Sequence, residues 1–118
     1  MNGQTLIQIQ QDLLTKAYDA FNTRDIDSVL ALMHSDVEWA NGMEGGHQAV
    51  RDYWTRQWSL IDPHVEPTSF QPDESGRVVV YVHQVVQGLD GNLICDQMVQ
   101  HIYTIENGLI RRMDIQDS

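Results

Sequence analysis

The sequence contains one cysteine, few basic residues and no long apolar run, and each scarcity excludes a class of protein. The lone Cys95 cannot form an intramolecular disulfide, and no Cys or His pair has metal-ligand spacing. We therefore expect a buried structural thiol and no metal site. Seven basic residues stand against seventeen acidic ones, and the formal charge of −10 argues against nucleic acid or an anionic membrane as a partner.

The apolar stretches are only a few residues long, which excludes a transmembrane helix. The N-terminus MNGQTLIQIQQD has neither the basic start nor the apolar segment of a signal peptide, so we expect a cytoplasmic protein. A length of 118 residues suits one small domain with its own core, and we assign residues 1–118 to that single domain.

Helical periodicity dominates the first half. Apolar residues recur every three or four positions over residues 5–22, which predicts an amphipathic helix, and Asp25 is the expected N-cap of a shorter second helix. A strand at residues 36–39 and the turn-rich stretch ANGMEGG lead to a third helix, predicted from about residue 47 to residue 60. Pro63 is expected to end that helix.

Beyond Pro63 the apolar period changes to two. A looser extended stretch at residues 65–70 precedes three β segments, RVVVYVHQVVQG, NLICDQMVQHIYTI and LIRRMDI. The dipeptides Asp90-Gly91 and Asn107-Gly108 between them tolerate positive φ and predict hairpin turns. Helices followed by an antiparallel meander indicate an α+β fold with the helices on one face of the sheet.

His101 is the most informative polar residue of these strands. Alternation places it on one face with Gln97, Val99, Tyr103 and Ile105, and this face is the more apolar and aromatic. Polar groups on an apolar wall suggest a small-molecule pocket. We therefore predict that His101 is a hydrogen-bond donor or general acid/base, assisted by Tyr103 and Gln97. A buried histidine bonded to Gln97 or to a backbone carbonyl is the structural alternative.

The last hairpin decides what faces His101. A three-residue loop at residues 106–108 pairs His101 with Met113. A two-residue turn pairs it with Asp114, which could orient the imidazole for proton transfer. We favour the first register, because the second turns Arg112 and Asp114 toward the enclosed face, where unpaired charge is costly.

The preceding hairpin decides which polar residue joins the same wall. A two-residue turn there pairs Gln97 with Gln84 and His101 with Val80, whereas a slip by one residue places His83 instead of Gln84 on the wall.

The order of elements resembles the SnoaL-like branch of the nuclear transport factor 2 superfamily over nearly the whole chain. The stretches YDAFNTRDIDSVLALMHSDVEW, GGHQAVRDYW and HIYTIENGLIRRMDI carry the resemblance. It implies a cone-shaped barrel, in which a curved antiparallel sheet wraps around three N-terminal helices, with a deep pocket at the open end and often a homodimer through the outer sheet face. The reaction is less defined, because the superfamily includes isomerases, cyclases, dehydratases, epoxide hydrolases and binding domains.

The ketosteroid isomerase pattern of this superfamily transfers only in part. Trp39 stands at the position of its aspartate base, His101 at that of its protonated aspartate donor, and Met113 at that of a methionine lining its site. Its catalytic tyrosine falls at about Ala17. Tyr18 is one residue away and is expected to point to a different face. The steroid isomerisation mechanism is therefore not transferred.

Further ligand contacts are expected around these positions. Trp39 and Trp54 could stack on a flat ligand, although aromatic residues at helical spacing often belong to the core. The loop ANGMEGG could close the pocket mouth, or serve as a plain connector. The predicted catalytic residues are His101 and Tyr103, and the predicted ligand contacts are Trp39, Asn41, Met43, Trp54, Gln84, Gln97, Val99 and Met113.

Two functions fit these observations. One is an enzyme without metal or cofactor that acts by acid/base chemistry, as an isomerase, cyclase or dehydratase, on an apolar cyclic or polyketide-like substrate. The other is a non-catalytic ligand-binding or dimerisation module. No second ionisable group is placed beside His101, which weakens the enzyme hypothesis. Apolar residues on the other sheet face, including Val79, Met98 and Ile102, favour a homodimer.

Overall fold

Helices α1 and α2 begin at polar caps. The computed structural model describes residues 5–117, and α1 spans Leu6–Asn22. Thr5 and Gln8 form a capping box, because the side chain of each accepts a hydrogen bond from the backbone of the other. Asp25 accepts from the backbone nitrogen of Ser28 and caps α2, Ile26–Leu30, as predicted.

Helix α3, His47–Trp58, ends earlier than predicted, and Pro63 does not end it. The backbone nitrogen of Ser59 closes the last turn by hydrogen bonding to carbonyls of α3. Pro63 instead lies inside β3, Ile61–Pro72. The prediction was wrong because β3 is an edge strand, where a residue without an N–H group can be placed without loss of a ladder hydrogen bond.

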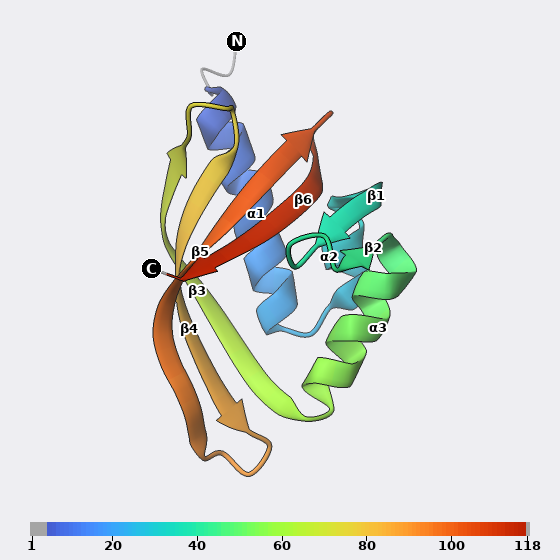
Figure 1. The fold of residues 1–118 in the computed structure, drawn as a ribbon, viewed down its shortest axis with the longest axis vertical. Coiled ribbons are helices and arrows are strands. Elements are labelled where there is room, and N and C mark those ends of the chain that lie inside the picture. The colour runs from blue at the N-terminus through green and yellow to red at the C-terminus, as the bar shows by residue number, and fades with distance from the viewer. Residues whose placement is uncertain (1–4, 118) are drawn as a thin grey trace.

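The strands form one curved sheet of six strands in the order β2-β1-β6-β5-β4-β3. The remaining bounds are β1 Met33–Trp39, β2 Glu44–Gly45, β4 Val78–Gly88, β5 Leu93–Glu106 and β6 Leu109–Asp117. Strands β3 to β6 pair antiparallel, which confirms the meander. Strand β1 pairs in parallel with β6, so the sheet is mixed and not purely antiparallel. Figure 1 shows the long strands curving around α1, with α3 across from β4 and β5.

The β4–β5 register agrees with the prediction: Gln84 pairs with Gln97, and Val80 pairs with His101. Cys95, in this hairpin, was expected to be buried, but it is only half-buried.

The β5–β6 register differs from both alternatives. The turn has two residues, Asn107 and Gly108, but Arg111 is an extra, unpaired residue that shifts the ladder. His101 therefore pairs with Ile115, and neither with Met113 nor with Asp114.

The bulge explains why the apolar face survives this change. Ile110 and Met113, which lie on either side of the bulge region, are both fully buried. Arg112 and Asp114 form an ion pair with nitrogen and oxygen 2.9 Å apart, and both are partly exposed. The charged residues thus stay off the enclosed face, where unpaired charge is costly.

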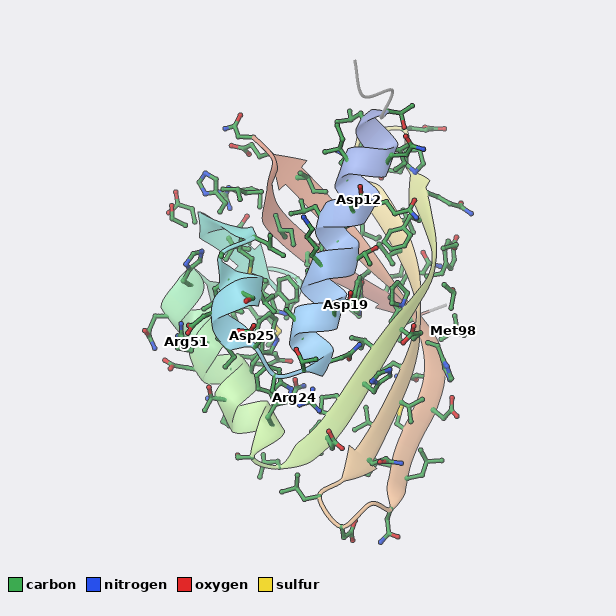
Figure 2. The ribbon with its side chains drawn as sticks, turned by 180° about the vertical axis from the view of Figure 1, so that it is seen from behind. Asp12, Asp19, Arg24, Asp25, Arg51 and Met98 are labelled. Carbon is green, nitrogen blue, oxygen red and sulfur yellow. The ribbon has the colours of Figure 1, made fainter. Side chains whose placement is uncertain are left out.

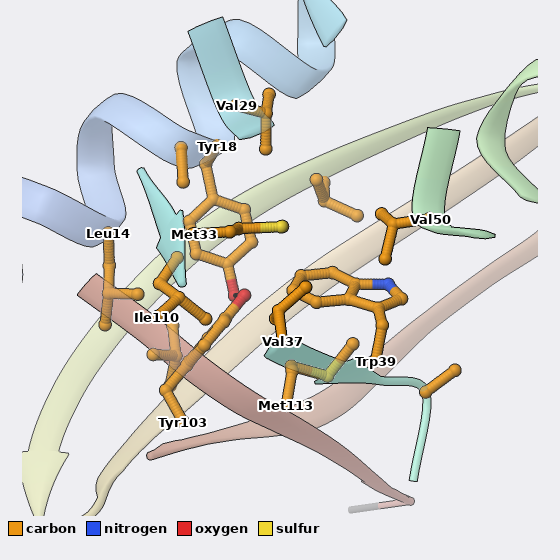
Figure 3. Close-up of a cluster of buried hydrophobic side chains, with 14 of the residues drawn as sticks. Leu14, Tyr18, Val29, Met33, Val37, Trp39, Val50, Tyr103, Ile110 and Met113 are labelled. Atoms are coloured by element: carbon orange, nitrogen blue, oxygen red, sulfur yellow. Dashed lines mark hydrogen bonds between the residues drawn. The ribbon is translucent and has the colours of Figure 1, made fainter. Parts of the chain in front are cut away.

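The core lies between α1 and the concave face of the sheet. Its largest members include Leu14, Tyr18, Trp54, Tyr103 and Met113, and Figure 3 shows a part of this cluster. The outer side of α1 carries exposed Asp12 and Asp19, while exposed Met98 lies on the outer face of the sheet (Figure 2). Within residues 5–117 no helix has the length and apolar character that a membrane span requires.

Candidate functional site

A cavity of about 100 Å³ lies between α1, α3 and the concave face of the sheet. Since one water occupies about 30 Å³ in the liquid, this space holds roughly three waters or one ring-sized part of a larger ligand. Aromatic rings form much of its wall: Tyr18, Phe21, Trp39, Tyr53, Trp54 and Tyr103. Such a wall suits a flat apolar molecule.

Three buried polar side chains, Tyr18, His101 and Tyr103, form what we call the cavity floor. The Tyr103 hydroxyl donates to the Tyr18 hydroxyl at 2.9 Å, and the Tyr18 oxygen lies 2.7 Å from Nδ1 of His101. His101 is 9% exposed and the two tyrosines less. Figure 3 shows Tyr18 and Tyr103 directing their hydroxyl groups toward each other. The floor is therefore a continuous hydrogen-bond chain joining α1 to β5.

Burial sets the protonation of the floor. Desolvation lowers the pKa of His101 to about 4, so its imidazole is neutral at pH 7. Desolvation likewise raises the pKa of Tyr18 and that of Tyr103 above the ordinary tyrosine value, so both hydroxyls keep their protons. All three groups are uncharged at neutral pH.

The hydrogen-bond chain fixes the tautomer of His101. The Tyr18 hydroxyl accepts a hydrogen bond from the Tyr103 hydroxyl, and among the described residues the acceptor for the hydrogen bond that Tyr18 donates is Nδ1 of His101. A neutral imidazole that accepts at Nδ1 carries its proton on Nε2. If the bonds ran the other way, with Nδ1–H of His101 donating to Tyr18 and Tyr18 donating to Tyr103, the buried hydroxyl of Tyr103 would have no acceptor among residues 5–117, which is unfavourable.

Nε2 of His101 is open to the cavity. Among the described residues, the one buried side-chain nitrogen or oxygen without a hydrogen-bond partner is Nε1 of Trp58. Nε2 of His101 also has no hydrogen-bond partner within the described residues, but it is not among these fully enclosed atoms, so it is partly accessible. Because His101 lines the cavity, we take this accessible side to face the cavity. The floor therefore presents one N–H donor to whatever enters.

Two glutamines form what we call the cavity mouth. Gln57 from α3 and Gln84 from β4 line the cavity, and both are half-buried. The described lining includes no Asp, Glu, Lys or Arg side chain. In the same part of the chain, no three His, Cys, Asp or Glu residues are grouped as metal ligands would be. The cavity thus offers polar but uncharged contacts.

Six of the residues predicted from the sequence line this cavity: Trp39, Trp54, Gln84, His101, Tyr103 and Met113. The rings of Trp39 and Trp54 meet edge to face, with centroids 5.3 Å apart and planes at 89°. The fold thus brings both catalytic candidates and four of the predicted ligand contacts together in this cavity.

The other four predicted residues lie elsewhere. Val99 is buried in the core, and Gln97 is exposed although it pairs with Gln84. Met43 is 79% exposed. Asn41 holds its loop to β6, because its backbone nitrogen donates to the carbonyl of Met113 and its Oδ1 accepts from the Ile115 backbone nitrogen at 2.8 Å.

The sequence interpretation missed Gln57 at the mouth and Tyr18 at the floor. Tyr18 was expected to point away from the site, yet both Ala17 and Tyr18 line the cavity. The apolar face of a helix is broad enough to include neighbouring positions, and the short Ala17 side chain leaves room for the tyrosine. The available signal was its position four residues after Leu14, on the buried stripe of α1.

A family model for the SnoaL-like domain matches residues 14–113. The chain belongs to the SnoaL-like family. No curated protein matches it in sequence. The TerC structure co-crystallised with polyporic acid aligns with this SnoaL-like domain at a TM-score of 0.80 and 25% identity, covering 93% of this chain and 92% of TerC.

Two further solved structures show the same fold. A nuclear transport factor 2-like protein of unknown function from Burkholderia pseudomallei aligns at a TM-score of 0.80 and 22% identity, covering 93% of this chain and 91% of its own. A candidate polyketide cyclase from Xanthomonas campestris aligns at 0.77 and 22% identity, covering 94% and 91%. The SnoaL-like domain thus has the same α+β fold as this nuclear transport factor 2-like protein.

Proposed function

We propose that this SnoaL-like domain binds a small, uncharged, apolar cyclic or polyketide-like compound and hydrogen-bonds its carbonyl oxygen through Nε2 of His101. The observation that carries this proposal is the chain from Tyr103 through Tyr18 to His101. It holds a single N–H donor at the end of an aromatic cavity, where a hydrogen bond is stronger than in water.

A polarised carbonyl supports acid/base chemistry without a cofactor. A donor placed at the oxygen stabilises the negative charge that develops when a neighbouring C–H bond loses its proton to form an enolate. His101 does this as a neutral donor, because its pKa is about 4. An isomerase-, cyclase- or dehydratase-like step follows when water or a second group of the substrate accepts the proton.

Related structures support a small-molecule role. TerC was crystallised with polyporic acid, and the Xanthomonas campestris relative is described as a candidate polyketide cyclase. These ligands and activities belong to those proteins. They support the general class of compound proposed for this cavity.

A non-catalytic ligand-binding module is the second candidate, and one observation favours it. The described cavity lining has no carboxylate, so no side chain there is an obvious strong base. The cavity then holds its ligand by the aromatic wall and by His101 without turning it over.

One experiment tests binding and the choice between these candidates. 2-Acetylnaphthalene is the probe, and 2-ethylnaphthalene is the control that lacks the carbonyl. We expect the ketone to bind more tightly and to change the emission of Trp39 and Trp54. The His101→Phe variant should keep the fold and lose roughly tenfold in affinity for the ketone, about one hydrogen bond, while binding the control unchanged.

Turnover is scored with the same probe. An enolising protein speeds the exchange of the acetyl methyl protons for deuterium in D₂O, followed by NMR, and His101→Phe removes the acceleration. Binding without faster exchange favours the module. Equal binding of ketone and control by wild-type protein would contradict the carbonyl contact.

The outer face of the sheet supports a homodimer as part of this proposal. Ile94 is 59% exposed and Met98 41% exposed on β5, and Val79 and Ile102 are half-buried beside them. Apolar residues grouped on an open sheet face favour association. Light scattering at micromolar concentration should give the mass of two chains, and a monomer would contradict the proposal.

A further inference from the structure

The cavity mouth carries hydrogen-bonding capacity that the protein does not use. Neither side-chain amide, that of Gln57 nor that of Gln84, has a hydrogen-bond partner among residues 5–117, although both line the cavity and are half-buried. Each amide offers two N–H donors and an acceptor oxygen. Partly buried polar groups normally bind protein, water or a ligand, and these two amides line the cavity in which a ligand would lie.

The mouth and the floor lie at a defined separation on the sheet. His101 pairs with Val80, and Gln84 lies four residues further along β4 with its side chain on the same face. At about 3.3 Å per residue, the two polar ends are roughly 13 Å apart along the strand, and side-chain reach shortens the gap. The wall between them is aromatic and apolar.

We infer that the ligand of this cavity is elongated and ditopic, with a carbonyl oxygen at the floor and a neutral hydroxyl group held by Gln57 and Gln84 at the mouth. The inference rests on the proposed function, which supplies the carbonyl contact. A cavity of about 100 Å³ encloses only part of such a molecule, so its far end lies at the mouth, beside the two amides.

The charge distribution around the cavity favours a neutral polar group, rather than an acidic one, at the end of the ligand that lies at the mouth. The described lining has no Lys or Arg to pair with a carboxylate, and the whole chain has a formal charge of −10. Amides pair equally well with a donor or an acceptor but do not compensate a full charge. A hydroxyl group satisfies these conditions, and an acidic group does not.

The test uses two matched ketones measured by isothermal titration calorimetry. 6-Hydroxy-2-acetylnaphthalene carries the second polar group, and 6-methyl-2-acetylnaphthalene has the same size without it. We expect wild-type protein to prefer the hydroxyl compound by roughly five- to tenfold, the value of about one hydrogen bond. The variant with Gln57→Met and Gln84→Met keeps side-chain length, and its preference for the hydroxyl compound should fall below about twofold.

A shorter pair of ketones controls for reach. 4-Hydroxyacetophenone and 4-methylacetophenone have the carbonyl too close to the second group to contact floor and mouth together, so we expect no preference between them. A preference that survives in the double variant, or one equally large for the short pair, would overturn the inference.

The variant His101→Phe separates this inference from the proposed function. It should weaken both naphthyl ketones by the same factor and leave the preference for the hydroxyl compound. If wild-type protein binds both ketones with equal affinity, the inference fails and the proposed function stands. If His101→Phe changes no affinity but the Gln-dependent preference is present, the floor contact fails, and with it the two-ended ligand, while the hydroxyl contact at the mouth stands. Absence of binding by every probe overturns both.

Discussion

The floor and the mouth of one cavity differ in whether the protein itself supplies hydrogen-bond partners for their polar groups. At the floor, the hydroxyls of Tyr18 and Tyr103 and Nδ1 of His101 are bonded to one another and buried. At the mouth, Gln57 and Gln84 are half-exposed and have no side-chain hydrogen bond within the described residues. The two regions share a wall, yet the protein satisfies the floor except for Nε2 of His101 and leaves both amides of the mouth without a protein partner within residues 5–117.

This difference separates stability from recognition. A buried chain whose members satisfy each other contributes to folding, and removing its central member leaves unpaired groups behind. A half-exposed amide keeps water as a partner when no ligand is present, so removing it changes little in the free protein. We therefore expect floor variants to alter the free energy of unfolding, with His101 variants also altering affinity, and mouth variants to alter affinity alone.

The largest effect is expected for Tyr18→Phe. The change leaves the hydroxyl of Tyr103 and Nδ1 of His101 without their bonds while keeping the ring. Two buried polar groups lose a partner, so the free energy of unfolding should fall by about 2 to 5 kcal/mol. Urea denaturation of both proteins at pH 7.5 measures the difference. A loss below about 0.5 kcal/mol would mean that water already satisfies the floor, and the comparison with the mouth would fail.

The pH dependence of stability gives the next largest effect. Burial depresses the pKa of His101 to about 4 in the folded protein, against about 6.5 in the unfolded chain. As the pH falls below 6.5 the unfolded chain therefore binds the proton first, and stability is lost until the pH passes below about 4. Between pH 7.5 and 5 this group removes about 2 kcal/mol of stability.

The variant His101→Phe isolates that contribution from the other titrating groups. Its stability should fall less than that of the wild type between pH 7.5 and 5, by about 2 kcal/mol, in paired urea titrations. Identical pH profiles would mean that His101 is solvated and protonates freely. The affinity of the wild type for 2-acetylnaphthalene should stay constant from pH 7.5 to 5.5, since the imidazole remains neutral there.

The fold was predictable because its signals are local. Thr5 and Asp25 cap their helices, and the change from helical to alternating periodicity separates helices from sheet. The bulge at Arg111 was not predictable by the same means, because turn chemistry defines only the first pair of a hairpin. After the two-residue turn, a single extra residue moved the partner of His101 from Asp114 to Ile115 while keeping the apolar face.

The site was predictable for the strands and less so for the helices. Strict alternation put His101 and Tyr103 on one face, and they share the cavity. In a helix, neighbouring positions do not alternate between two faces, so the prediction that Tyr18 points away from Ala17 was wrong. The hydrogen bond from Tyr18 to His101 joins residues 83 apart in sequence, and no local pattern encodes it.

A smaller loss of stability is expected for Tyr103→Phe. This change removes the donor at the end of the hydrogen-bond chain. The oxygen of Tyr18 loses one accepted hydrogen bond but still bonds to His101. About 1 kcal/mol should be lost, less than for Tyr18→Phe. The direction of the remaining bond is then no longer fixed, so nitrogen chemical shifts of His101 should change from a single Nε2–H tautomer toward a mixture. A pure tautomer in the variant would show that Tyr103 does not set the direction.

The smallest effect on stability is expected at the mouth. Gln57→Met and Gln84→Met keep an unbranched side chain of similar length and remove only the amide, which has no partner within the described residues. Each variant should therefore unfold within about 0.5 kcal/mol of the wild type in urea, and the double variant should equal the sum of the two. The same double variant should lose its preference for the hydroxyl ketone. If either single change costs more than about 1 kcal/mol, the amide is satisfied inside the free protein, and the mouth is then built like the floor and is not left open for a ligand.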